Sequence, residues 1–100
     1  MEEPRPLTTL KYEEVLGLAE EWLRHASSVI RGDTIYMGKV RREELREWLR
    51  ERGYGLECAL DLHLFYHALG EVAPKLGWRV VRDWRNSRHR ARVILRRVVG

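Results

Sequence analysis

Arginines are concentrated in the last quarter of the chain, where eight of them fall within the nineteen residues from Arg79 to Arg97. A guanidinium is permanently charged and presents a planar fork of donors, which suits phosphate oxygens and can also enter a narrow minor groove. Residues Lys75 to Gly100 contain nine Lys/Arg and one acid, a net charge of +8, whereas residues 1–74 have a net charge of −4. This asymmetry predicts a surface that binds phosphates, and therefore nucleic acid.

Two tryptophans, Trp78 and Trp84, stand among these arginines. Exposed tryptophans could stack on bases, but we favour burial in the core, because a small domain needs large buried side chains. The arginines could also pair with acids of the same chain or bind an acidic protein partner. The net charge of −4 on the rest of the chain is too small for intramolecular pairing to neutralise all of them.

His63 and His67 lie four residues apart in a segment with helical periodicity, and Glu71 follows four residues later. This spacing can place two imidazoles and a carboxylate on one helix face, as in some metal sites. Because the ligand set is incomplete, we interpret them as a polar face that contacts a partner, and we expect no metal or other cofactor. The spacing leaves open a ribonuclease that uses His63, His67 or His89 beside arginines.

Motifs typical of enzymes are absent from the sequence. There is no phosphate-binding glycine loop, no metalloprotease helix motif and no nucleophile elbow. Ser27 or Ser28, His25 and Asp33 are the residue types of a catalytic triad, but adjacent residues on a helix point in different directions. We therefore expect no enzymatic activity.

The composition is typical of a soluble protein with one domain. Of its 100 residues, 44% are hydrophobic and 34% are charged, and no apolar run approaches the roughly 20 residues needed to span a bilayer. The single cysteine, Cys58, excludes an intrachain disulfide. Together with the absence of a signal peptide, it predicts a cytoplasmic protein with no membrane partner. The lack of Gln and the single Asn favour a thermophilic source.

Hydrophobic periodicity predicts a first helix over about Thr9 to Ile30, after a flexible lead of residues 1–8, within a single domain of residues 9–100. Thr8 or Thr9 is expected to cap this helix, and Gly32 to end it. Its apolar stripe consists of Val15, Leu18, Ala19, Trp22, Ala26, Val29 and Ile30. Three additional leucines suggest the hypothesis of a homodimer formed through this helix: Leu10, Leu16 and Leu23.

A short strand over Thr34 to Met37 and a second helix from about Arg41 to Arg52 follow in the sequence. Leu45, Trp48 and Leu49 form the predicted buried stripe of this second helix. On another face lie Arg42, Arg46 and Arg50, which we interpret as part of a solvated face neutralised by glutamates.

The third helix is expected to begin near Leu56 to Ala59. Because proline removes a backbone donor, Pro74 predicts a kink or break between Gly70 and Pro74, with a last helical turn before Gly77. The segment from Trp78 to Val98 has the pattern of a β-hairpin with a polar, basic link. In its second strand, apolar residues alternate with arginines, which predicts one buried and one cationic face: Ala91, Val93 and Leu95 against Arg90, Arg92, Ile94 and Arg96.

The predicted order of helix, short strand, helix, turn, helix and basic hairpin resembles the winged helix-turn-helix domain over about residues 9 to 98. Three stretches carry the resemblance: Val40–Leu45 opening the second helix, Leu76–Trp78 closing the third, and Val81–Arg90 as the wing. The wing is loosely similar to that of MarR-type regulators. The resemblance implies an α+β fold with three helices, a short strand and a C-terminal β-hairpin wing.

In that family the third helix enters the major groove of DNA and the wing contacts the backbone or the minor groove. By position, the resemblance places further residues of the third helix on its presented face: Asp61, Tyr66 and Glu71. The implied nucleic-acid contacts are His63, His67 and Lys75 from the third helix, and Arg82, Arg85, Arg88, His89, Arg90 and Arg92 from the wing.

We therefore predict a DNA-binding protein, either a small transcription regulator or a DNA-associated accessory factor, that docks on duplex DNA through its wing and third helix. Two alternatives stay open. One is a protein-interaction module, a winged-helix subunit of a larger complex, which is favoured by the low Lys/Arg content of the third helix. The other is an RNA-binding protein, because a basic hairpin with aromatic residues also suits RNA.

Overall fold

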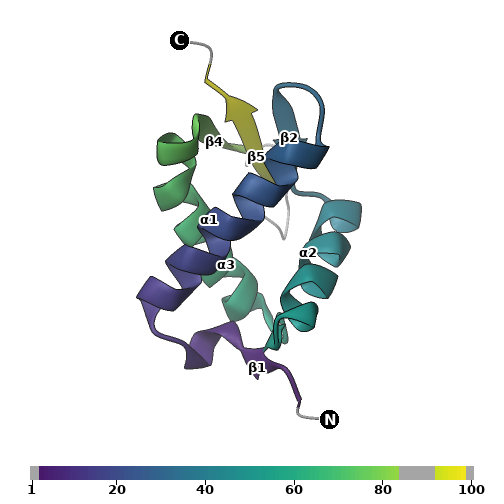
Figure 1. Cartoon of the computed structure of the whole chain (residues 1–100), viewed down its shortest axis with the longest axis vertical. Coiled ribbons are helices and arrows are strands. Elements are labelled where there is room, and N and C mark those ends of the chain that lie inside the picture. Colours follow the sequence, from purple (N-terminus) through teal and green to yellow (C-terminus); the bar gives the residue numbers. More distant parts are fainter. Residues whose placement is uncertain (1–2, 84–91, 99–100) are drawn as a thin grey trace.

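The computed structural model describes residues 3–83 and 92–98, in which three α-helices accompany a three-stranded antiparallel sheet (Figure 1). The fold is therefore α+β with a C-terminal hairpin, as predicted, and its layout is compatible with a winged helix. The elements are β1 (Arg5–Pro6), α1 (Tyr12–Val29), β2 (Thr34–Tyr36), α2 (Lys39–Glu51), β3 (Tyr54–Gly55), α3 (Ala59–Val72), β4 (Trp78–Asp83) and β5 (Arg92–Arg97).

The helices pack through the apolar stripes that their periodicity predicts. α1 crosses in front of α3 in Figure 1, and the rings of Trp22 and Phe65 meet edge to face, with centroids 6.1 Å apart. α2 buries Leu45, Trp48 and Leu49, all three of which were predicted to be buried. Burial of such stripes, more than helix propensity, stabilises helices of this length. No helix in the described part of the chain combines the length and apolarity needed to cross a membrane.

α1 begins at Tyr12, later than predicted, because the residues before it form a turn of their own. Leu7–Thr9 is a short 3-10 helix, and the Thr9 hydroxyl donates a hydrogen bond to a preceding backbone carbonyl 2.6 Å away. Lys11 occupies the N-cap position of α1 with no side-chain cap. The prediction that Thr8 or Thr9 caps this helix is therefore wrong.

The N-terminal segment is packed against the domain from Arg5 onward, unlike the flexible lead predicted for residues 1–8. Leu7 is fully buried. β1 pairs with β3 in parallel, and the backbone N–H of Arg5 donates a hydrogen bond to the Gly53 carbonyl at 2.9 Å. The two prolines that suggested a loose segment are compatible with this arrangement, because a two-residue edge strand needs few ladder donors.

The three leucines that suggested a dimer lie in or against the core of the chain itself. Leu23 is fully buried, and Leu10 and Leu16 are partly buried and pack against the core. Val29, predicted on the buried stripe, is instead 60% exposed near the end of α1. Leu10 and Leu16 keep part of their surface exposed, and the homodimer stays a prediction.

The sheet has the order β2-β5-β4, with β5 in the centre. Ile35 and Val80 both lie opposite Leu95 in the register, and Leu95 is fully buried. Val93 is also buried, whereas Arg96 is exposed. The predicted alternation of β5 is confirmed for these residues, and it places the apolar face of the sheet on the core.

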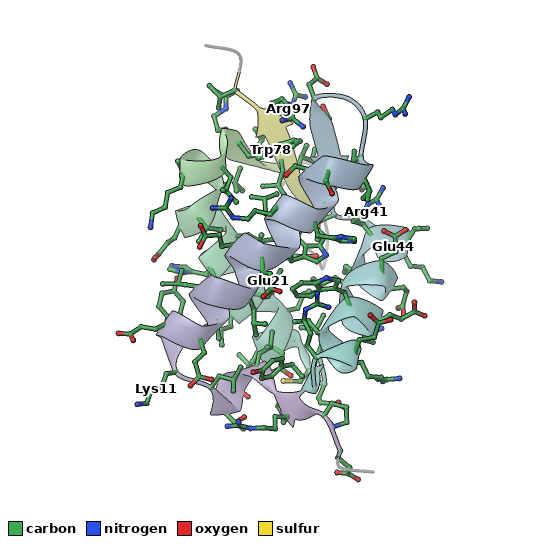
Figure 2. The ribbon with its side chains drawn as sticks, viewed as in Figure 1. Lys11, Glu21, Arg41, Glu44, Trp78 and Arg97 are labelled. Carbon is green, nitrogen blue, oxygen red and sulfur yellow. The ribbon has the colours of Figure 1, made fainter. Side chains whose placement is uncertain are left out.

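Trp78, at the start of β4, is fully buried, which confirms the prediction that it belongs to the core. Figure 2 shows Arg97 beside it, and the guanidinium carbon lies 4.4 Å from the centroid of the indole ring. This cation–π contact covers the ring at the end of the sheet. Trp84, the other tryptophan of the hairpin, lies outside the described residues.

Pro74 breaks the third helix, as predicted. α3 ends at Val72, and Ala73–Leu76 continues as a 3-10 helix. Gly77 then takes a left-handed conformation with φ of +81°, which glycine adopts without strain. After this turn the chain enters β4, so the hairpin follows the break in the third helix directly.

The burial of Leu7 yields a test of the packed N-terminal segment. Leu7→Ala is expected to lower the free energy of unfolding by about 2–5 kcal/mol, because it leaves a cavity in the core. The matched control is Leu60→Ala, since Leu60 is 68% exposed, and this change is expected to stay within about 0.5 kcal/mol. Urea unfolding measures both. Equal, small effects would contradict the packing of residues 5–9.

Candidate nucleic-acid interface

The start of α3 is fixed by Asp61, whose carboxylate is fully buried. It accepts hydrogen bonds from the backbone N–H groups of Thr8 at 3.0 Å, Glu57 at 2.7 Å and Cys58 at 3.2 Å. Burial alone would raise the pKa of Asp61, but these hydrogen bonds outweigh it and the pKa is lowered. The expectation that Asp61 is presented on the outer face of α3 is therefore wrong, because it caps the helix from inside the fold.

A pocket of about 600 Å³ opens between the first turns of α2 and α3. One side is formed by residues 36–39 and by Arg42 and Arg46 of α2. The other side is formed by residues 56–59 and by Leu62, His63 and Tyr66 of α3. We call this cavity the α2–α3 pocket. It combines apolar and cationic side chains, as ligand-binding pockets commonly do.

The charges around the α2–α3 pocket are mostly positive. Lys39, Arg42 and Arg46 contribute three cations, and Glu57 contributes one carboxylate. The Arg46 guanidinium donates a hydrogen bond to Glu43 at 2.6 Å. Among the described residues, no carboxylate forms an ion pair with Lys39 or Arg42. Within the described part of the chain, nothing therefore competes with an outside anion for these two cations.

Tyr66 forms part of the pocket wall and is only 7% exposed. Its hydroxyl is buried and has no hydrogen-bond partner among the described residues. Burial raises the pKa of Tyr66 to about 12, and the nearby positive charge of Arg42 opposes this shift. The expectation that Tyr66 lies on the presented face of α3 is corrected, because its ring belongs to the core and only its edge lines the pocket.

The hairpin is joined to the sheet beside the same pocket. The Met37 N–H donates a hydrogen bond to the Val93 carbonyl at 3.0 Å, directly before α2 begins. Asp83 and Arg92 are the last pair of the β4–β5 ladder, so the ladder ends near the start of α2. The backbones of Arg82 and Arg92 belong to this end of the ladder. The other predicted wing residues lie outside the described residues: Arg85, Arg88, His89 and Arg90.

The predicted contacts on α3 and after it have different neighbours. His63 lines the α2–α3 pocket. His67 faces α1, where its Nδ1 lies 2.8 Å from the Tyr12 hydroxyl oxygen and 3.7 Å from a Glu71 carboxylate oxygen. Partial burial and the Glu71 carboxylate raise the pKa of the Tyr12 phenol. His67 is thus exposed but has partners within the chain, and it lies four residues from His63 on the same helix.

Lys75 lies beside acids of α1. It lines a second recess of about 450 Å³ together with Glu13 and Glu20. Glu71 lines the recess too, so this environment suits an intramolecular electrostatic role better than a contact with phosphate, because the surrounding charge is negative. Within residues 3–83 and 92–98, no cluster of three or more His, Cys, Asp and Glu side chains is arranged to hold a metal ion.

The α2–α3 pocket was not predicted from the sequence, because its parts are far apart in the chain. Arg42 and Arg46 were assigned to a solvated face of α2, and Tyr66 was treated as a presented residue of α3. Only the packing of α2 against α3 brings them together. The available signal was the arginine stripe on α2, of which only Arg46 forms an ion pair among the described residues, whereas Arg42 and Arg50 form none.

Comparison of the chain with protein-family models, with curated proteins and with solved structures finds no match. The function must therefore be inferred from the residues and their arrangement.

The hydrogen bonds of Asp61 yield a pH-dependent test. Asp61→Asn is expected to lower the free energy of unfolding at pH 7 by about 1–3 kcal/mol, because the new amide places a donor against backbone donors. The lowered pKa of Asp61 means that its contribution is complete above the unfolded value of about 3.9 and is lost as the pH falls through the folded value. The difference between wild type and variant should therefore shrink in acid.

The control for this test is Asp33→Asn, because Asp33 is exposed. Its free energy of unfolding at pH 7 should stay within about 0.5 kcal/mol of wild type. Urea unfolding at pH 7 and at several acidic values measures all three proteins. A difference between wild type and Asp61→Asn that is independent of pH would contradict the role given to the Asp61 carboxylate.

Proposed function

We propose that this chain is a winged helix-turn-helix protein that binds duplex DNA, as a small transcription regulator or a DNA-associated accessory factor. The observation that gives this the strongest support is the hydrogen bond between Met37 and Val93. It holds the end of the β4–β5 ladder beside the start of α2. The end of the ladder, after which the arginine-rich link follows in the sequence, is thereby joined to the part of α2 that carries Lys39 and Arg42, two cations without an ion pair among the described residues.

The sheet order adds support for the winged-helix assignment. β2 enters the sheet before α2 and pairs with β5, and β4 and β5 follow α3. A helix pair inserted between the first strand and a C-terminal hairpin is the arrangement in which a winged helix offers its third helix and wing together to DNA. The link between α2 and α3, residues 52–58, is longer than the three or four residues of a short helix-turn-helix turn.

Docking would rest mainly on phosphate contacts. Lys39 and Arg42 at the start of α2 form no ion pair among the described residues, so binding to phosphate would break no such pair. Arg41 donates a hydrogen bond to Glu44 at 2.6 Å on the outer face of α2, where both are labelled in Figure 2. Partly exposed pairs of this kind contribute little to stability, so Arg41 could exchange its partner for a phosphate.

In this proposal α3 reads few bases, and the hairpin supplies most of the affinity. His63 is exposed beside the pocket and can donate or accept a hydrogen bond at a base edge. Asp61 and Tyr66 are buried, and His67 contacts α1. The binding mode supported best is therefore one in which phosphate contacts supply most of the affinity and little of the sequence preference.

Exposed apolar side chains favour a second candidate function, a protein-interaction module built on the same fold. Leu60 in the first turn of α3 is 68% exposed, and Val40 in the first turn of α2 is 73% exposed. Each is the chain neighbour of a residue that lines the α2–α3 pocket. A partner protein that covers the start of α2 and α3 could bury them.

The DNA proposal is tested by the salt dependence of binding. Fluorescence anisotropy with a labelled random duplex would compare wild type with the triple variant Arg85→Ala/Arg88→Ala/Arg90→Ala. Wild-type affinity should fall steeply as salt rises, because bound phosphates release counterions. The variant should bind more weakly, and the slope of log K against log salt should be shallower by up to about three.

A second triple variant controls for the loss of net charge: Arg5→Ala/Arg24→Ala/Arg31→Ala. It removes three exposed arginines from β1, α1 and the loop after α1, and its slope should stay close to that of wild type. Equal slopes for the two variants would show that only net charge matters. Absence of duplex binding at low salt would contradict the proposal. If the chain binds an RNA duplex or single strands more strongly, that nucleic acid replaces duplex DNA as the proposed ligand.

A further inference from the structure

Tyr66 and Arg42 both line the α2–α3 pocket, and each carries a hydrogen-bond donor that no described residue uses. The Tyr66 hydroxyl is buried and has no hydrogen-bond partner among the described residues, and Arg42 forms no ion pair among them. Folded proteins rarely leave a buried polar group unpaired, because losing its bonds to water costs free energy. An unpaired hydroxyl beside an unpaired guanidinium is an arrangement that a bound acceptor would complete.

The charge around these donors indicates the kind of acceptor. Lys39 and Arg46 line the same pocket, and Glu57 is the only carboxylate among its described lining residues. The first residues of α3, including Ala59, also form part of the wall, so the positive end of that helix dipole faces the cavity. The Asp61 carboxylate reduces this dipole contribution, which leaves the side chains of Tyr66 and Arg42 as the decisive groups.

We propose that the α2–α3 pocket binds a small organic anion, whose phosphate or carboxylate group accepts hydrogen bonds from the Tyr66 hydroxyl and the Arg42 guanidinium. The rest of the ligand lies against the apolar part of the wall, formed by Met37, Leu56 and Leu62. The volume of about 600 Å³ lies within the range of small-molecule sites. A charge-assisted pair of hydrogen bonds orients the anionic end, and the apolar wall selects the body of the ligand.

A small molecule fits this pocket better than a backbone phosphate of a duplex. The Tyr66 hydroxyl is buried, whereas the phosphates of a duplex lie on the outside of a wide, stiff helix and would stay at the pocket mouth. The site therefore does not depend on the proposed DNA binding. If both functions hold, the small anion and the duplex compete for Lys39 and Arg42, and the anion weakens DNA binding.

The probe for this proposal is phenyl phosphate, which joins an anionic group to a flat apolar body. Inorganic phosphate and phenol serve as its two separate halves, all at constant ionic strength. Titrations followed by amide NMR shifts are expected to show saturable changes around Tyr66 and Arg42 with phenyl phosphate, weaker binding of inorganic phosphate, and the weakest binding of phenol. Binding of inorganic phosphate as tight as that of phenyl phosphate would contradict a site for an organic anion.

Three variants assign the binding to the named donors. Tyr66→Phe and Arg42→Gln should each weaken the binding of phenyl phosphate by about tenfold or more, the usual effect of losing a hydrogen bond to a charged group. Arg50→Gln is the matched control, because Arg50 is an exposed arginine of α2 outside the pocket, and it should bind like wild type. Tyr66→Phe should melt at the same temperature as wild type or higher, since the hydroxyl has no partner among the described residues.

Cys58 supplies an independent readout, because it is the only cysteine of the chain and lines the pocket. Its reaction with a thiol reagent should slow when phenyl phosphate binds wild type, and should not slow in Arg42→Gln at the same concentration. Unchanged reaction rates, or equal affinity of Arg42→Gln and Arg50→Gln, would overturn the proposal. Neither result depends on whether the chain binds a duplex, so failure here is distinguishable from failure of the DNA proposal.

Discussion

The buried carboxylate of Asp61 fixes how the N-terminal turn, the α2–α3 link and α3 are placed relative to one another. It joins the N-terminal turn, which is distant in the chain, to the α2–α3 link and the first turn of α3, through the backbone N–H groups of Thr8, Glu57 and Cys58. Burying a charge is unfavourable unless it is hydrogen-bonded, and here three backbone donors offset the cost. The direction in which α3 leaves this junction decides where its later side chains lie, and hence the shape of the α2–α3 pocket.

The side chains around that pocket do not all serve stability. The apolar side chains of the core are buried, and Arg41 and Arg46 of α2 form ion pairs with glutamates of the same helix. Tyr66 and Arg42 depart from this pattern at the pocket, where the described part of the fold leaves their donors unused. The buried Nε1 of Trp78, outside the pocket lining, is a second donor without a partner among the described residues. Proteins commonly retain such unfavourable groups where binding requires them, because selection for function opposes full optimisation of stability. Because the pocket lies beside the end of the β4–β5 ladder, the unused donors of Tyr66 and Arg42 lie near the strands that flank the most basic part of the sequence.

Local sequence patterns were sufficient for most elements of the fold. Leu45, Trp48 and Leu49 are buried as their spacing indicates, and Pro74 ends α3 because a missing backbone donor acts locally. The burial of Leu7 and Asp61 was missed, since it depends on contacts between segments that are distant in the chain, such as the hydrogen bond from Thr8 to Asp61. The candidate site was predicted in part, because charge density is visible in the sequence, whereas a pocket formed by two helices depends on their packing.

In the proposed DNA complex, the start of α2, the exposed side of α3 and the end of the β4–β5 ladder form one surface for the duplex. Mapping of backbone amide shifts in the presence of a short random duplex would locate this surface residue by residue. We predict that the largest shifts include Lys39, Arg42, His63 and Val93, with small shifts around Glu13 and Lys75. The largest shifts around Glu13 and Lys75, with none at the start of α2, would contradict the proposed surface.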